Sequence, residues 1–470
     1  MPIIIVLTAL ASAVILGFLA TSVAPYILFT IASALIVSLF AFTSPKLSLG
    51  LLLLSMLFSP EIGFGALTGH RSVVIRYDDI LLVIIFLAWL ARNAVMKGKA
   101  FITDTPVQTP IIVYTSLCVL STIFGILRGN IHAEVAAFYV LKYVEYFLLY
   151  FLTVNVLDSK EDIRKYLRFA AFIAIAVTSY AYFYYFNAGA GARASAPFEA
   201  PFGKPDESEP ASLGGYLLMV MGVFFGFIAS GSGAAFSWSL AALLLIFPAF
   251  LLTFSRASYL GFAFMMLAVI FNSARRRVLL ICILVVGMAS LIGTKGFSSK
   301  IRERVEMTYS GQYATNEIKF LGVKIKLEES AYIRYASIRE AFTVRLVKHP
   351  LMGHGVTGVG LADTQYALLL GELGLLGFFV FFWMLYRVYV TARVVYRAYD
   401  ETWVKAVALG LMVSIVGLLA QAVGVNTFII VRIMEPFWFL TAVVMRLYLL
   451  RPSKPGLGRA GSEPQAGRFK

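Results

Sequence analysis

The sequence is dominated by apolar runs that follow one another at short intervals from the first residues to about position 450. A helix of about 20 apolar residues crosses the roughly 30 Å hydrocarbon layer of a bilayer, so these runs predict membrane helices. Hydrophobic residues make up 60% of the 470 residues and charged residues 14%, against about 45–50% and about 25% in soluble domains. Backbone groups in lipid must bond internally, which leaves helices or a closed barrel. Because ten-residue alternating segments are absent, we predict an all-α polytopic membrane protein.

Hydropathy predicts about 12–14 transmembrane helices with one large external loop between the late helices. The candidate spans cover residues 3–20, 26–42, 47–60, 79–96, 110–127, 136–157, 165–186, 211–230, 234–254, 256–272, 277–293, 365–391, 404–429 and 435–450. The first run lacks a basic region before it, so we interpret it as the first span and not as a cleavable signal peptide.

Lysine and arginine gather in the short connections after the fourth, sixth, tenth and twelfth spans, and in the tail after Arg451. If the helices alternate in direction, all these connections fall on one side, which the positive-inside rule assigns to the cytoplasm together with both termini. The net charge of +15 therefore indicates topology, and we do not expect nucleic acid as a partner.

Four regions follow from this pattern. They are an N-terminal helix bundle at 1–293, a large periplasmic or extracellular loop at 294–364, C-terminal transmembrane helices at 365–450, and a cytoplasmic, disordered tail at 451–470. Within the loop, alternation at 323–327 predicts a short strand or hairpin. Residues 330–348 predict a helix with Ser330 as its N-cap, on which Arg334, Ile338, Ala341 and Arg345 share one face. Basic residues on the outer side are not explained by topology, and an anionic ligand is one explanation.

Three charged residues stand where chemistry is expected, and each also has a structural interpretation. Arg256 occupies a tight turn among small hydroxyl side chains and would otherwise anchor a helix at the lipid surface. Arg334 would otherwise be a solvated arginine. Asp363 directly precedes an apolar run, where an aspartate also suits an N-cap. Lys142 and Glu145 are three residues apart and can pair on one helix face.

Other motifs point less strongly to a function. The glycine-rich stretch 353–360 is interpreted either as a turn that offers backbone N–H groups to an anion or as a flexible connector. The four histidines and two cysteines show no metal-ligand spacing, and Walker, nucleophile-elbow and dinucleotide motifs are absent.

Three motifs together resemble a known family. Residues 253–261 (TFSRASYLG) resemble the T-x-S-R-[GA]-x-[WLY]-x-G signature of the O-antigen ligase and polymerase superfamily. Arg334 followed by 349–355 (HPLMGHG), and 363–377 (DTQYALLLGELGLLG), resemble its next two conserved stretches in the same order. The segment around Arg193 is similar to the family's preceding outer loop. The resemblance covers about residues 250–380.

The resemblance implies a glycosyltransferase of the bacterial cytoplasmic (inner) membrane whose active site faces the periplasm or exterior. Its donor would be an undecaprenyl-diphosphate-linked glycan, and its acceptor another lipid-linked glycan (polymerase) or lipid A core (ligase). Neither a metal nor a cofactor is implied, and a chain-length regulator is an expected partner. Ligases usually carry histidine where this chain has Asp363, which favours a polymerase of O-antigen or exopolysaccharide. A transporter or flippase of an anionic lipid-linked glycan is the alternative from another class, although we find no internal repeat.

Within this expectation, Asp363 is the general base of an inverting transfer. Arg256 and Arg334 bind the diphosphate, since guanidinium groups match phosphate oxygens in pairs. The predicted additional phosphate-binding residues are Arg345, Lys295 and Lys300, and the predicted supporting residues are Ser255, Tyr366, Glu372 and Arg193.

Overall fold

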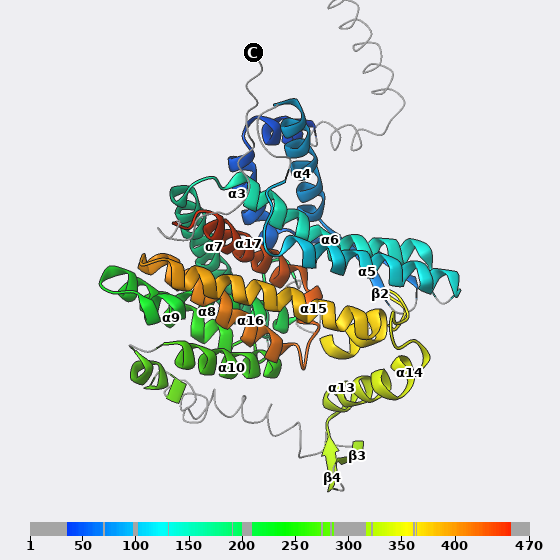
Figure 1. Ribbon diagram of the computed structural model, residues 1–470. Helices are drawn as coiled ribbons and strands as arrows, with labels where there is room; N and C mark the ends of the chain where they lie inside the picture. The colour runs from blue at the N-terminus through cyan, green and yellow to red at the C-terminus, as the bar shows by residue number, and fades with distance from the viewer. Residues whose placement is uncertain are drawn as a thin grey trace, which may run out of the picture.

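A computed structural model describes most of the chain. The described residues are 35–68, 71–96, 102–129, 131–189, 191–199, 209–273, 276–282, 284–285, 316–320, 323–360, 362 and 364–452. They form an all-α polytopic membrane protein with two small β-hairpins (Figure 1).

The described helices and strands come in the following order along the chain. They are α3 (Pro45–Phe58), β1 (Glu61–Thr68), β2 (Arg71–Arg76), α4 (Tyr77–Val95), α5 (Gln108–Leu127), α6 (Ala133–Val156), α7 (Lys160–Asn187), α8 (Pro210–Ser230), α9 (Ala234–Leu251), α10 (Arg256–Asn272), β3 (Asn316–Phe320), β4 (Val323–Leu327), α13 (Glu329–Glu340), the π-helical turn η2 (Ala341–Arg345), α14 (Leu346–Lys348), α15 (Gln365–Ala398), α16 (Thr402–Gln421), the 3₁₀ turn η3 (Thr427–Ile429) and α17 (Val431–Leu449).

Seven helices of the described chain are long and apolar enough to cross a membrane: α5, α6, α7, α8, α9, α15 and α16. The apolar helices α3 and α10 are shorter. Every expected span from 47 to 272 and from 365 to 450 coincides with a helix, which confirms the hydropathy pattern there. The span at 3–20, and most of those at 26–42 and 277–293, lie outside the described residues.

Close packing of α8 against α16 forms the centre of the bundle. Gly222 and Gly226 of α8 lie against Gly410 of α16, where a side chain on any of the three would meet backbone of the other helix. Small residues let membrane helices approach closely, and dispersion contacts then hold them together, because lipid gives little hydrophobic drive between helices. On the other side of the core, Trp438 of α17 packs edge-on against Phe147 and Tyr150 of α6.

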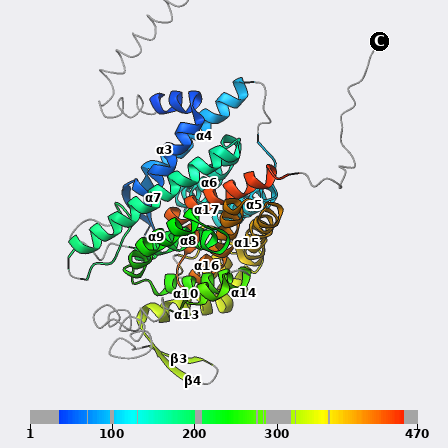
Figure 2. The same cartoon turned by 90° about the vertical axis from the view of Figure 1, so that its left-hand side faces the viewer.

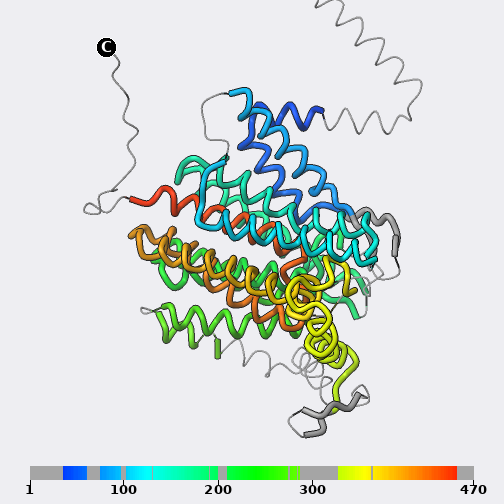
Figure 3. The backbone as a smooth tube through the Cα atoms, turned by 45° about the vertical axis from the view of Figure 1, so that its right-hand side comes forward, coloured from blue at the N-terminus to red at the C-terminus, as the bar shows by residue number. Residues whose placement is uncertain are grey.

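The end of the bundle at which α5 ends and α6, α8, α10 and α15 begin is here called the cavity end. The first turns of α15, yellow, lie there beside the cyan ends of α5 and α6, and α13, yellow-green, lies below them (Figure 3). The β3–β4 hairpin projects from the bundle below α13 in two perpendicular views (Figures 1 and 2). The other end of the bundle is called the opposite end.

The described part of the external loop confirms the strand predicted at 323–327, which pairs antiparallel with β3. The helix predicted at 330–348 is also present, but its N-cap is Glu328 and not Ser330. Its Ile338 and Ala341 pack with Leu368 and Leu370, which fixes the helix on α15. The β1–β2 hairpin, with Glu61 opposite Arg76, was not expected from the sequence.

Candidate functional site

A cavity of about 750 Å³ lies at the cavity end, among residues from α6, α8, α10, α13, α17 and the connections next to them. Its charged lining is mostly basic. The basic members are Arg76, Lys142, Arg193, Arg256, Arg334 and Arg432, and the acidic members are Glu199, Glu209 and Glu328. The predicted residues Arg193, Ser255, Arg256 and Arg334 are therefore brought together, although they come from three distant parts of the sequence.

Arg256 is the first residue of α10, and the turn before it is built from small hydroxyl side chains. Ser255 caps the helix by accepting from the Ser258 backbone N–H at 3.4 Å, and the Ser258 hydroxyl donates to Ser255 Oγ at 2.8 Å. Gln421 Nε2 donates to Ser258 Oγ at 3.1 Å, which ties this turn to α16. The sequence TFSRAS thus gives a fixed helix start, and Ser255 acts as a cap while lining the cavity.

The Arg256 guanidinium lies inside the protein and not at a lipid-facing anchor position. Its Nη1 is 2.6 Å from Glu328 Oε2, and the two side chains are only 26% and 22% exposed. Glu328 is the residue before α13, so this ion pair joins α13 to the bundle across the cavity.

Arg334 lies one turn into α13 and is held against the turn that follows α16. Its Nε donates to the Gly424 carbonyl oxygen at 2.8 Å. Gly424 is confined between Arg334 and Ala257, because a Cβ there would be 3.1 Å from the Ala257 Cβ. Arg334 is therefore a positioned side chain and not simply a solvated arginine.

Arg432 is a cavity residue that the sequence did not suggest. It is buried at the start of α17, and its Nη1 donates to the Pro197 carbonyl oxygen at 2.6 Å. In the same connection Glu199 accepts from Ser195 Oγ at 2.9 Å and from the Ala196 N–H at 3.1 Å. Burial raises the pKa of Glu199, and the positive charge of Arg432 opposes that rise. Arg432 and Glu199 thereby order the connection that carries Arg193.

Behind the cavity, a buried charge network supports Arg76 and Lys142. Arg76 Nη2 is 2.7 Å from Asp78 Oδ2, and the Arg76 backbone N–H donates to Asp79 Oδ2 at 2.7 Å. Lys142 contacts the same Asp79 carboxylate and lies 3.3 Å from Glu145 Oε1. The expected Lys142–Glu145 pair is confirmed, but it belongs to a larger network that links α4 to α6. Charges buried among membrane helices are costly unless paired, which explains the clustering.

Glu372 does not line the cavity; its carboxylate organises the turn at 353–358. Oε1 accepts from the Thr357 N–H at 2.8 Å, and Oε2 accepts from the Tyr143 hydroxyl at 3.1 Å. The N–H groups of His354 and Gly355 donate to carbonyl oxygens of α15, each at 2.9 Å. These N–H groups bond to α15, so they are not offered to an anion. The same bonds hold the turn in place against α15, so it is not a flexible connector.

The contact between this turn and α15 also requires glycine at two positions. Helix α15 is broken at Gly374, whose φ is 65°. A Cβ on Gly374 would lie 2.5 Å from the Leu351 oxygen, and a Cβ on Gly353 would lie 2.7 Å from the Gly374 nitrogen. The two backbones touch here, so side chains are excluded from both positions.

Gly374→Ala is therefore expected to lower the free energy of unfolding by roughly 2–5 kcal/mol, from backbone strain and steric overlap together. Thermal unfolding of the purified protein in detergent measures this. Gly360→Ala is the matched control, because φ at Gly360 is 62° but no atom lies within 4 Å of the position that a methyl group would take there. Equal losses in the two variants would show that the contact of backbones contributes nothing.

The remaining predicted residues lie elsewhere. Arg345 pairs with Glu340, with Nη2 and Oε1 2.9 Å apart, and is not part of the described cavity lining. Tyr366 donates from its hydroxyl to the Leu419 carbonyl oxygen at 2.5 Å and so packs α15 against α16. Lys295, Lys300 and Asp363 lie outside the described residues.

The N-cap of α15 is Thr364, whose Oγ1 accepts from the Ala367 N–H at 3.2 Å. Thr364, and not Asp363, is thus the N-cap of α15. On the other side of Asp363, the Ala362 carbonyl oxygen accepts from Asn426 Nδ2 at 2.6 Å, and Asn426 lines the cavity.

In the part of the chain that the structure describes, no three His, Cys, Asp or Glu side chains are grouped so that they could hold a metal ion. What this cavity offers chemically is six basic side chains against three carboxylates, an excess of positive charge suited to an anionic ligand. Comparison of the chain with models of protein families, and with curated proteins, gives no match.

Proposed function

We propose that this protein is a membrane glycosyltransferase that polymerises undecaprenyl-diphosphate-linked oligosaccharide repeat units. The observation that supports this proposal is the cationic cavity, in which Arg256 and Arg334 meet from α10 and from the external helix α13. These two arginines belong to the motifs on which the family resemblance depends. The cavity end would face outward, because the basic connections gather at the opposite end.

The chemistry proposed is a single displacement. A hydroxyl oxygen of the acceptor glycan attacks the anomeric carbon of the donor, the bond from that carbon to the phosphate oxygen breaks, and the undecaprenyl diphosphate leaves. Arg256 and Arg334 stabilise the negative charge that builds on the leaving oxygen, with Arg193 and Arg432 adding to the positive potential. The proton of the attacking hydroxyl passes to the Asp363 carboxylate. Attack from the face opposite the leaving group inverts the anomeric configuration.

The test is an assay of purified protein in proteoliposomes with a synthetic lipid-linked repeat unit as both donor and acceptor. Polymerase activity gives products that grow by whole repeat units and releases undecaprenyl diphosphate. A ligase would act only when lipid A core is added, and a flippase would move the lipid across the bilayer without changing its mass. Failure to extend the glycan with any repeat unit from the source cell would contradict the proposal.

Removing Glu328 from its ion pair with Arg256 should strengthen donor binding, whereas removing an arginine should not. Glu328→Gln removes a carboxylate that competes with an anionic donor for Arg256, so KM for the donor should fall about two- to fivefold while kcat is unchanged. Initial rates at varied donor concentration measure this. Glu340→Gln is the matched control, because Glu340 pairs with Arg345 away from the cavity lining. A rise in KM for the Glu328 variant would contradict the proposed competition.

A further inference from the structure

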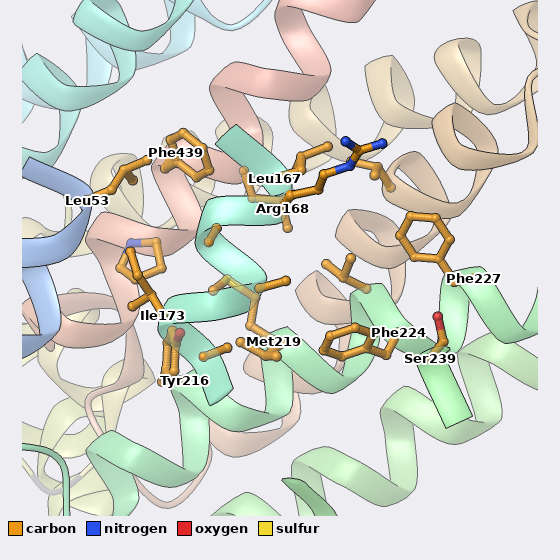
Figure 4. A pocket seen from close by; sticks show the side chains of 18 of the residues that line it. Leu53, Leu167, Arg168, Ile173, Tyr216, Met219, Phe224, Phe227, Ser239 and Phe439 are labelled. Atoms are coloured by element: carbon orange, nitrogen blue, oxygen red, sulfur yellow. The ribbon is translucent and has the colours of Figure 1, made fainter. Parts of the chain in front are cut away.

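A second cavity, of about 540 Å³, lies between α3, α7, α8, α9, α16 and α17 and is almost entirely apolar (Figure 4). We call it the lateral groove. Side chains such as Ile173, Met219, Phe224 and Phe439 point into it from three different helices. It shares α8 and α17 with the arginine cavity but uses residues further along both helices, toward the opposite end.

The packing of α7 and α9 explains why a groove exists here. Near the cavity end the two helices are joined, because the Tyr182 hydroxyl donates to the Leu245 carbonyl oxygen at 2.7 Å. Toward the opposite end, residues of both helices line the groove instead of filling it, and Trp238 of α9 is 76% exposed. On the inner side, Pro436 lies within α17 and lines the groove. Its ring has no N–H to donate and adds to the apolar wall.

The charges on the groove are of one sign. Arg164 and Arg168 are the charged residues in its described lining, and they lie one turn apart on the exposed side of α7. The Arg164 guanidinium lies over the Trp403 ring, 4.8 Å from its centroid. An arginine pair beside tryptophan at the end of a membrane helix is typical of the level of lipid headgroups.

We propose that the lateral groove is a binding site for an anionic phospholipid, with an acyl chain between α7, α8 and α9 and the phosphate at Arg164 and Arg168. The apolar walls accept a lipid chain but cannot select one lipid over another, because the bulk bilayer is equally apolar. Selection therefore comes from the two arginines, and basic pockets between membrane helices favour anionic headgroups. At about 1 kcal/mol for each arginine, the pair should give roughly a thirtyfold preference over a zwitterionic lipid. This inference is independent of the proposed reaction.

Tryptophan fluorescence gives a local test, since Trp238 and Trp403 both line the groove. The full-length protein, carrying Trp383→Phe to remove an exposed tryptophan outside the groove, is reconstituted in phosphatidylcholine nanodiscs. A small fraction of the lipid is replaced by phosphatidylglycerol or phosphatidylcholine with brominated acyl chains, which quench only nearby tryptophans. We expect the brominated phosphatidylglycerol to quench at about a thirtyfold lower mole fraction.

Two double variants that remove the same charge distinguish binding at the lateral groove from general electrostatic attraction of anionic lipid to the protein. R164Q/R168Q should remove the preference, whereas R393Q/R397Q, which removes the same charge from the same end of the bundle outside the groove lining, should keep it. Equal quenching by the two brominated lipids in the parent protein would overturn the proposal. A preference that survives in R164Q/R168Q would overturn it too, because the anionic lipid would then be bound elsewhere. Quenching by neither lipid would show that something other than lipid fills the groove, with the same consequence.

Discussion

Replacing Arg334 with alanine should reduce the rate of polymer formation by about 10²- to 10³-fold, the usual effect of losing one fixed donor to a charge that develops during reaction. Arg334 lines the cavity and is held in place by Gly424, so the variant removes a positioned charge and not a mobile one. The loss should appear mainly in kcat, because the charge on the leaving oxygen is greatest in the transition state. Initial rates in proteoliposomes, normalised to folded protein, measure it.

Arg339→Ala is the matched control, because Arg339 lies on the same helix but is exposed and outside the cavity lining. Arg334→Lys keeps the charge but loses the planar pair of donors, so its activity should fall between that of the parent and that of the alanine variant. Arg334→Ala with normal kcat would remove Arg334 from the proposed mechanism, whatever happens to KM.

Asp363→Asn should reduce turnover by about 10²- to 10⁴-fold, the range for loss of a general base. The amide keeps the size of the side chain but cannot accept a proton. Binding of the donor should be preserved, since the diphosphate is assigned to the arginines.

Donor binding to Asp363→Asn can be measured by its protection of the protein against thermal unfolding. Asp400→Asn, at an exposed position in the connection after α15, serves as the control. Loss of donor protection together with activity would mean that Asp363 holds substrate or structure and is not a base.

The apolar helices and α13 could be predicted because they depend on local patterns. Apolar runs of the right length predicted the helices from α3 to α10 and from α15 to α17, and alternation predicted β4. Motifs predict Arg256 and Arg334 as site residues, and the cavity brings both together.

The sequence does not identify Arg432 and Lys142 as cavity residues, for a physical reason. Arg432 and Lys142 sit within apolar helices, where the sequence shows that a charge is present but not which neighbours accompany it. Lys142 was assigned to Glu145 on its own helix, whereas its contact with Asp79 requires α4 and α6 to be adjacent. A signal was available in Arg76, Asp78 and Asp79, three charges at the beginning of an apolar run, where burial without partners is too costly.

Arg345 shows that residues on one helix face need not reach one site. Its Cδ lies 3.3 Å from the position that a Cβ on Gly371 of α15 would take, on the side where Ala341 also packs against α15. Arg345 is eleven residues beyond Arg334, which is about 16 Å along a regular helix. Its guanidinium therefore meets Glu340 and is not part of the cavity lining.

We expect the break in α15 to set the depth at which the cavity lies in a bilayer. Its 34 residues would extend about 51 Å as one straight helix, well beyond the roughly 30 Å of hydrocarbon. Because Gly374 interrupts it, residues 375–398 alone reach about 36 Å, which is enough to span the hydrocarbon. The turns before Gly374 then need not cross the hydrocarbon and can lie at headgroup level, where a lipid carries its phosphates. A polyprenyl-linked donor could then present its diphosphate to the arginines at its own resting depth, with its tail still dissolved in the membrane.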